Sequence, residues 1–122
     1  MTLRVSATYL TATLQDARAR TLELVNGLDQ VQLMGPKIPG VNPLRWEIGH
    51  IAYFYEFFIL RQLYGHNSIL GLKADELYDS IAVAHDTRWD LPLLSMADTL
   101  TYMQDVLDKL CEHLINNNED GL

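Results

Sequence analysis

The stretch that decides the fold is NPLRWEIGHIAYFYEFFILRQLYG, which runs from Asn42 to Gly65. Apolar and aromatic side chains recur in it at the three- and four-residue spacing of an α-helix. The spacing predicts one long helix from about Pro43 to Tyr64, with Asn42 as its N-cap. Gly65 is the residue expected to end this helix. Its buried stripe is expected to comprise Ile48, Ile51, Tyr55, Phe58, Ile59 and either Gln62 or Leu63.

Two further long helices are expected, one on each side of this segment in the sequence. The first runs from about Ser6 to about Gln30 and is followed by MGPKIPGVNP, a loop with three prolines and two glycines. The other opens with the capping sequence SMAD at residues 95–98 and fades near Asn116. The expected apolar seams are Leu3, Leu10, Leu14, Ala17, Thr21, Leu24, Leu28 and Val31 in the first helix, and Met96, Leu100, Met103, Leu107, Leu110 and Leu114 in the last.

Three such seams predict an all-α protein, a helical bundle with shallow crossing angles. The connection of roughly 30 residues between the second and third helices is long enough to run back along the bundle, so these two helices are expected to be parallel. It contains one short predicted helix, in KADELYDSIAV. One domain over residues 1–122 is expected, with residues 116–122 as a frayed tail. A four-helix bundle needs one more helix than this sequence provides, and we expect a homodimer in which a second copy covers the open seam.

The overall composition narrows the class of protein. The chain has 122 residues, of which 48% are hydrophobic and 20% charged, as in ordinary globular domains. A net charge of -7 with scattered basic residues argues against a nucleic-acid partner. The longest apolar stretch is interrupted by Glu56 and is too short to span a membrane. Cys111 is the one cysteine, and we expect it to be a buried and inert thiol. Because one cysteine allows no disulfide within the chain, a cytoplasmic location is expected.

The order of four segments resembles the N-terminal DinB-like domain of ergothioneine-type sulfoxide synthases, over about residues 14–114. The segments are ARARTLELVNGL, NPLRWEIGHIAYFYEFFILR, ELYDSIAVAHDTRWDLPL and TLTYMQDVLDKL. The most specific part is the pattern W-x-x-G-H-x-x-x-x-x-E, formed by Trp46, Gly49, His50 and Glu56. The resemblance implies a DinB-like helical bundle joined to a second domain that is similar to formylglycine-generating enzyme.

The resemblance also implies a non-haem iron site with three histidines, which joins a thiol to the imidazole of a trimethylated histidine. One of these ligands stands at the position of His50, and the other two form an H-x-x-x-H pair on a fourth helix. This sequence has no such pair, since its histidines are His50, His66, His85 and His113. We therefore predict no catalytic residue and no resident cofactor, with His50 as a vestigial ligand bonded to a backbone carbonyl, a side chain or water. Iron is expected only where partners complete the site.

The other histidines are not expected to complete a site with His50. At about 1.5 Å of rise per residue, His113 is expected roughly 20 Å from His50 along the helix axis. His66 lies beyond the other end of the second helix. His85 could approach His50, together with Asp86, from the irregular segment.

A ligand-binding group is predicted in the segment DTRWDLP, where the resemblance implies an arginine that holds the thiol substrate. This points to Arg88, with Trp89 and Asp86 beside it, because arginine presents a planar fork of donors to carboxylates. The alternative is that Arg88 pins a loop to the bundle. Glu56, among aromatic residues, is expected to reach an edge or to pair with Arg45 or Arg88.

Three functions remain open from the sequence. The first is a stand-alone, non-catalytic DinB-like domain that acts as a dimeric scaffold or binding module. The second is a component of a split sulfoxide synthase that binds iron or a thiol substrate, with a separate partner supplying the catalytic domain. The third is a binding module that uses HDTRWDLPL for a small acidic ligand or a protein.

Overall fold

The computed structural model describes residues 5–116, and this part of the chain is helical, with no strand. Its long helices are α1 (Ala7–Val25), α3 (Leu44–Tyr55), which continues directly into the π-helix η1 (Glu56–Leu63), and α5 (Met96–Asn116). Its short helices are α2 (Gln30–Met34), α4 (Leu72–Tyr78) and the 3-10 turn η2 (His85–Thr87). The all-α class is therefore confirmed.

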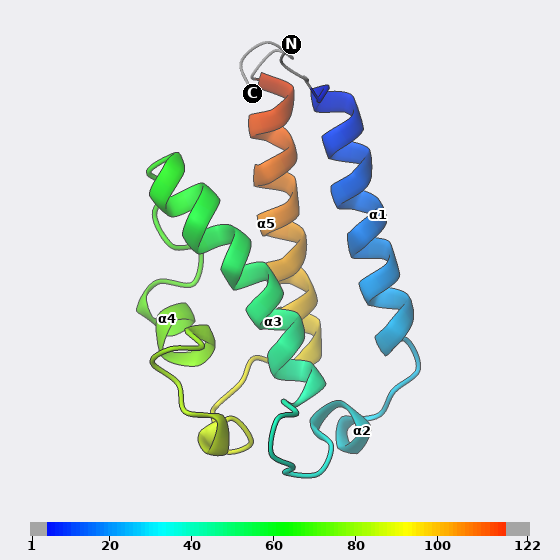
Figure 1. The fold of residues 1–122 in the computed structure, drawn as a ribbon, viewed down its shortest axis with the longest axis vertical. Helices are drawn as coiled ribbons and strands as arrows, with labels where there is room; N and C mark the ends of the chain where they lie inside the picture. The colour runs from blue at the N-terminus through cyan, green and yellow to red at the C-terminus, as the bar shows by residue number, and fades with distance from the viewer. Residues whose placement is uncertain (1–4, 117–122) are drawn as a thin grey trace.

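The long helices form the bundle that the seams predicted (Figure 1). From α1 the chain returns through α2, and α3 and α5 then run in the same direction, opposite to α1. The connection between them, residues 64–95, carries α4 and η2 along the side of α3. Helix α5 packs against both α1 and α3 and is therefore the central element. The predicted parallel pair with a long crossover is confirmed.

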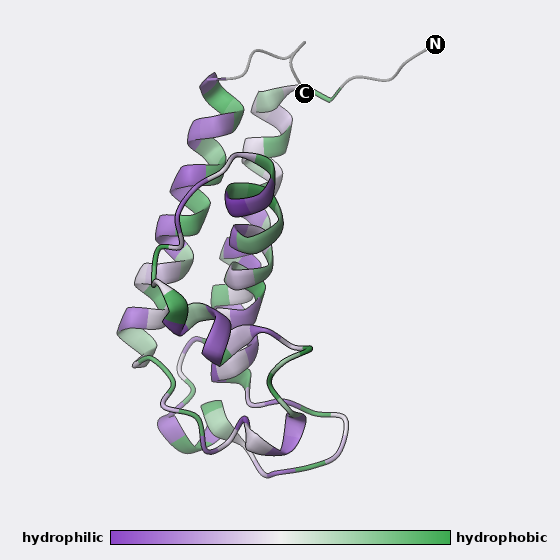
Figure 2. Ribbon diagram, turned by 90° about the vertical axis from the view of Figure 1, so that its left-hand side faces the viewer, coloured by the Kyte–Doolittle hydropathy of each residue, from purple (hydrophilic) through white to green (hydrophobic). Residues whose placement is uncertain are grey.

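The core lies where α3, η1, α4 and α5 meet. Hydrophobic and hydrophilic bands alternate along the long helices in Figure 2, as expected of amphipathic helices. The largest fully buried side chains include Trp46, Leu60, Tyr78, Tyr102, Met103 and Val106. The predicted α5 seam is confirmed at Met103, Leu107 and Leu110, which are all buried. Every helix in the described range is too short or too polar to cross a lipid bilayer.

The first helix ends earlier than predicted, at Val25 instead of near Gln30. Gly27 adopts a φ of 83°, a left-handed conformation that breaks a helix. Asp29 then starts α2 through a capping box: its carboxylate accepts the backbone N–H of Gln32, and the Gln32 amide accepts that of Asp29. The predicted seam also fails at Leu24 and Val31, which are each 80% exposed. Its first member, Leu3, lies outside the described residues.

The second helix has the predicted extent but a different start. Its N-cap is Pro43, not Asn42, and no side chain caps the first turn. The Asn42 side chain instead donates to Glu47 over 2.6 Å and accepts from Arg88 over 2.8 Å. Asn42, which was predicted to cap α3, therefore connects the first turn of α3 to Arg88 in the segment before α5.

The predicted buried stripe of this helix is confirmed only in part. Ile48 is buried, and Tyr55 and Ile59 pack partly buried against the core. Ile51 and Phe58 are instead 38% and 50% exposed, and the buried face also contains Gly49, Glu56 and Leu60. Glutamate is seldom buried and glycine has no apolar side chain to add to the periodicity, so the pattern favoured the neighbouring face. The π-helical turns of η1, with their i→i+5 bonds, also shift the register of the residues after Glu56.

An apolar stripe on α3 and η1 consequently remains on the surface. It consists of Ile51, Phe54 and Phe58, all exposed and spaced three and four residues apart. The rings of Phe54 and Phe58 contact each other, with centroids 4.8 Å apart. We call these three residues the exposed aromatic stripe.

Candidate functional site

His50 belongs to a set of contacts that join α3 to the end of α4. The last carbonyls of a helix have no donor within the helix, and here two of them, at Leu77 and Tyr78, receive donors from α3. The indole Nε1 of Trp46 donates to the Leu77 carbonyl over 2.7 Å. His50 Nδ1 donates to the Tyr78 carbonyl over 2.8 Å, since a carbonyl can only accept. Trp46 and His50 on α3 therefore cap the C-terminal end of α4.

The remaining contacts fix the plane of the His50 ring. It stacks on Trp46, with centroids 4.5 Å apart and an interplanar angle of 12°. A Cβ atom at position 49 would overlap the ring of Tyr78, so only glycine lets this ring lie against α3. Trp46, Gly49 and His50 thus have one shared structural role, which is to hold α4 in place.

These contacts also determine the tautomer of His50. Because Nδ1 carries the proton, the neutral ring has its lone pair on Nε2. A histidine that donates one ring N–H to a backbone carbonyl is held as metal-ligating histidines are. The ring helps to line a pocket of about 260 Å³ whose other lining residues are Tyr53, Phe54, Phe57, Phe58, Asp79, Ser80 and Ile81.

This pocket does not fit the three-histidine iron centre that the resemblance implies. Among residues 5–116, no group of three or more His, Cys, Asp and Glu side chains is placed to hold a metal ion. Asp79, the one carboxylate among the residues that line this pocket, accepts the backbone N–H groups of Ile81 and Ala82 over 3.0 and 3.3 Å. His50 is thus a single anchored imidazole, and no chemistry through iron follows from the described residues.

Arg88 is directed into the protein. Its side chain donates to the Asn42 amide oxygen over 2.8 Å and to the carbonyls of Ser80 and Val83 over 3.1 and 2.8 Å. Its guanidinium lies 4.0 Å from the ring centroid of Trp46, and the residue is 8% exposed. These contacts support the loop-pinning alternative. Binding of a ligand by Arg88 stays a prediction.

The neighbours of Arg88 secure the loop before α3. Trp89 Nε1 donates to the Gly35 carbonyl over 3.1 Å. His85 Nε2 lies 2.8 Å from the Val41 carbonyl, and its Nδ1 lies 3.3 Å from the largely exposed Asp86 carboxylate. The contacts of His85 are therefore with this loop and with Trp89, and they do not involve His50.

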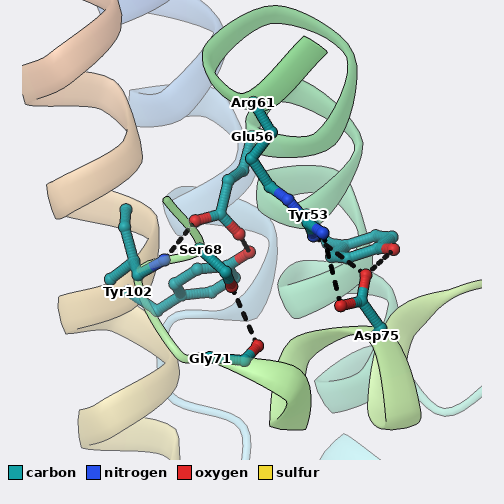
Figure 3. Close-up of polar contacts among 8 residues, drawn as sticks. Tyr53, Glu56, Arg61, Ser68, Gly71, Asp75 and Tyr102 are labelled. Atoms are coloured by element: carbon teal, nitrogen blue, oxygen red, sulfur yellow. Dashed lines mark hydrogen bonds and ion pairs between the residues drawn. The ribbon is translucent and has the colours of Figure 1, made fainter. Parts of the chain in front are cut away.

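The predicted pairing of Glu56 with an arginine was wrong. Glu56 is fully buried, and its two oxygens accept from the Tyr102 hydroxyl over 2.6 Å and from the Ile69 backbone N–H over 2.7 Å (Figure 3). Burial, together with the Glu56 carboxylate, raises the pKa of Tyr102 and keeps its donor proton in place. Arg45 donates instead to two backbone carbonyls just before α5. The acidic residue of the motif therefore joins η1, α5 and the following loop.

A second polar cluster joins η1 to α4, also shown in Figure 3. Asp75 accepts from the Tyr53 hydroxyl over 2.6 Å and from Arg61 over 2.9 Å. The Arg61 guanidinium lowers the pKa of the Asp75 carboxyl. Burial, followed by the bond to Asp75, raises the pKa of Tyr53. Both clusters hold the crossover against the bundle.

Sequence reasoning missed one juxtaposition. The Nε2 atoms of His66 and His113 lie 2.6 Å apart at the end of the bundle where η1 and α5 both finish. The expected parallel arrangement contained the signal, because parallel helices bring their C-terminal ends together.

Cys111 is free and buried, as expected. Burial, and next the Asp108 carboxylate, raises the pKa of its thiol. The protonated thiol is a poor nucleophile.

Comparison with known proteins relates this fold to named relatives. The chain is 34% identical over 117 residues to a hercynine oxygenase of Mycobacterium tuberculosis, an alignment that covers 95% of this chain and 27% of the relative. Hercynine oxygenases of Mycolicibacterium smegmatis and Mycolicibacterium thermoresistibile are 35% and 33% identical, over 85% and 87% of this chain and 24% of each relative. The chain thus spans about a quarter of the length of these relatives.

The family model described as DinB superfamily matches residues 13–122, which is nearly the whole chain. The matched range includes the His50 motif, the crossover and α5. The helical architecture and the sequence relationship agree, and this chain belongs to the DinB superfamily.

Proposed function

We propose that this chain is a DinB-like scaffold and binding module that is not a complete catalyst by itself. One observation carries the proposal: His50 is anchored beside an aromatic pocket that contains a single further side chain of a metal-ligating type, Asp79. The polar clusters around Glu56 and Asp75 hold the crossover that forms one wall of this pocket. The chain therefore presents a shaped pocket without a ligand set for a reactive metal.

The pocket suits a cationic ligand with an apolar body. Four aromatic side chains line it, and aromatic faces attract quaternary ammonium groups. Asp79 adds a carboxylate to the same wall, and the chain as a whole carries a charge of -7. The relatives are named for hercynine, whose trimethylammonium group and imidazole match this chemistry. Hercynine is therefore the proposed ligand of the pocket.

Isothermal titration calorimetry tests this proposal with hercynine and with L-histidine, which lacks the three methyl groups. We expect hercynine to bind more tightly than histidine, and Asp79→Asn to weaken its binding. The asparagine keeps an oxygen for the turn at residues 80–82 but removes the charge. Glu23→Gln, which alters an exposed carboxylate on α1 outside the pocket, is the control. Equal binding of both ligands, or no effect of Asp79→Asn, would contradict the proposal.

A second function is favoured by the tautomer of His50. With Nδ1 donating to Tyr78, the ring offers Nε2 as one preformed ligand, and a separate chain would supply the others and the catalytic domain. This is the split-synthase alternative. It predicts that purified protein retains iron after loading and desalting only when a partner is present, and that His50→Ala abolishes that retention. Iron retained equally by the wild type and His50→Ala would contradict a role for His50.

The scaffold role also predicts a homodimer. The exposed aromatic stripe lies on the α3–η1 face beside the pocket, and Phe54 and Phe58 belong to both. A second copy on this face would bury the stripe and close the open side of the pocket.

A further inference from the structure

A second histidine site lies at the end of the bundle where η1 and α5 both finish. His66 follows Gly65, whose φ of 73° turns the chain sharply after the helix. His113 lies in the last turn of α5. The Nε2 atoms of these two rings lie 2.6 Å apart.

The surrounding contacts hold both rings in this arrangement. The Tyr64 ring stacks on His113, with centroids 3.8 Å apart and an interplanar angle of 12°. The His66 ring stands edge-on to His113, at 4.7 Å and 72°. The backbone N–H of His66 donates to the Leu60 carbonyl over 2.8 Å, and Glu56 holds the same loop at Ile69. The short distance between the two Nε2 atoms is therefore supported by hydrogen bonds of the backbone as well as by contacts of the rings.

Two converging imidazole nitrogens are ligands suited to zinc, nickel and copper ions. In the apo form only one proton can lie between them, so one ring donates and the other accepts. A metal about 2.0–2.1 Å from each nitrogen, with an angle of about 90–110° between the bonds, needs nitrogens about 2.8–3.4 Å apart. The rings would have to separate by less than about 1 Å, and both are only partly buried, so they have room to do so.

The electrostatic surroundings favour a cation. A hollow beside His66 is lined by three carboxylates and one lysine: Asp105, Asp108, Glu112 and Lys109. The opposite side is an apolar pocket between α1, η1 and α5, which His113 and Tyr64 also line. Solvent therefore reaches the pair from the acidic side and can provide the remaining ligands.

The geometry points to a divalent transition-metal site formed by His66 and His113, separate from the pocket at His50. Since residues 5–116 place no third protein ligand there, water completes the coordination shell. Bound metal would tie the chain after η1 to the last turn of α5. This inference does not depend on the proposed function of the His50 pocket.

Competition against a chromophoric chelator tests the site with Zn²⁺ and Ni²⁺ on untagged protein. We expect one equivalent to bind, and His66→Asn or His113→Asn to weaken binding by at least about tenfold. His85→Asn, which alters a histidine outside the pair, should bind as the wild type does. Unchanged affinity in the double variant His66→Asn/His113→Asn, or an equal loss of binding in His85→Asn, would overturn the inference.

A measurement on the wild type keeps the test valid if a variant unfolds. In ¹⁵N spectra of the histidine rings, added Zn²⁺ should shift the Nε2 signals of two histidines and leave the other two unchanged. Circular dichroism of the metal-free variants shows whether each one is folded. Zn²⁺ that shifts all four histidines equally, or none, would show that no such site exists.

Discussion

At the scale of single residues, Glu56 illustrates how a buried acidic side chain is satisfied by hydrogen bonds. Both carboxylate oxygens accept hydrogen bonds, one from a tyrosine and one from backbone, and these replace its lost hydration. The residue lies at the junction of η1, α5 and the loop that contains His66 and Ile69. Its role in the motif is therefore structural.

Replacing Glu56 by leucine should destabilise the protein by about 2–4 kcal/mol, because the Tyr102 hydroxyl and the Ile69 N–H lose their acceptors. Glu56→Gln should cost less, since it retains one acceptor oxygen. Urea unfolding followed by circular dichroism measures both values. Tyr102→Phe is the complementary variant, and it should cost about 1.5–3 kcal/mol by leaving one carboxylate oxygen unpaired. A free energy of unfolding that is unchanged in Glu56→Leu would contradict this account.

The Asp75 cluster makes stability depend on pH in the acid range. Because Arg61 lowers the folded-state pKa of Asp75, the unfolded state binds the proton more readily. The stabilisation is present above the ordinary carboxyl pKa and is lost as the pH falls through the lowered value. Asp75→Asn should therefore be less stable than the wild type at pH 7, by about 1 kcal/mol for this partly exposed pair, and the difference should shrink below pH about 4.

Urea unfolding of both proteins between pH 7 and pH 3 measures this difference. Glu23→Gln, which alters an exposed carboxylate on α1, should run parallel to the wild type. A difference in the free energy of unfolding between Asp75→Asn and the wild type that grows as the pH falls would contradict this prediction.

At the scale of elements, the contact between α3 and α4 depends on Gly49. A methyl group at this position would overlap the Tyr78 ring, and Tyr78 is fully buried and cannot simply swing into solvent. Gly49→Ala should cost about 1–3 kcal/mol through overpacking. It should also weaken the bond between His50 and the Tyr78 carbonyl. Thermal unfolding gives the first quantity, and the His50 ring ¹⁵N shifts report the second. Ala19→Gly, in an exposed part of α1, is a control for backbone effects.

Helix positions were predictable because they depend on local spacing and on punctuation by glycine and proline. Ser95 accepts the N–H of Asp98 over 3.0 Å, as the sequence SMAD indicated. The end of α1 was less predictable, since the capping residue Asp29 lies inside a stretch that still has apolar spacing. The buried face of α3 and η1 was predictable at Ile48 but not at Gly49 and Glu56, because these two are buried through contacts with distant residues.

At the scale of the whole molecule, the exposed aromatic stripe is the surface on which we expect self-association. Phe58→Glu should weaken a dimer by about 2 kcal/mol or more, which is roughly a thirtyfold rise in the dissociation constant. Size-exclusion chromatography with light scattering, over a range of concentrations, measures this. Leu24→Glu is the matched control, because Leu24 is also exposed but lies on α1. A wild type that stays monomeric at micromolar concentration would contradict the dimer.

The sequence by itself determined the helical class, the approximate extent of the long helices and the parallel course of the second and third, since periodicity and connection length are local properties. The sequence also contains the W-x-x-G-H-x-x-x-x-x-E motif, which indicated the DinB-like family. Tertiary structure alone decided the roles of the motif residues: Trp46 and His50 cap α4, and Glu56 binds Tyr102 and Ile69. It alone brought His66 and His113 together. The physical reason is that each of these contacts joins residues far apart in the chain, and their geometry exists only after the helices have packed.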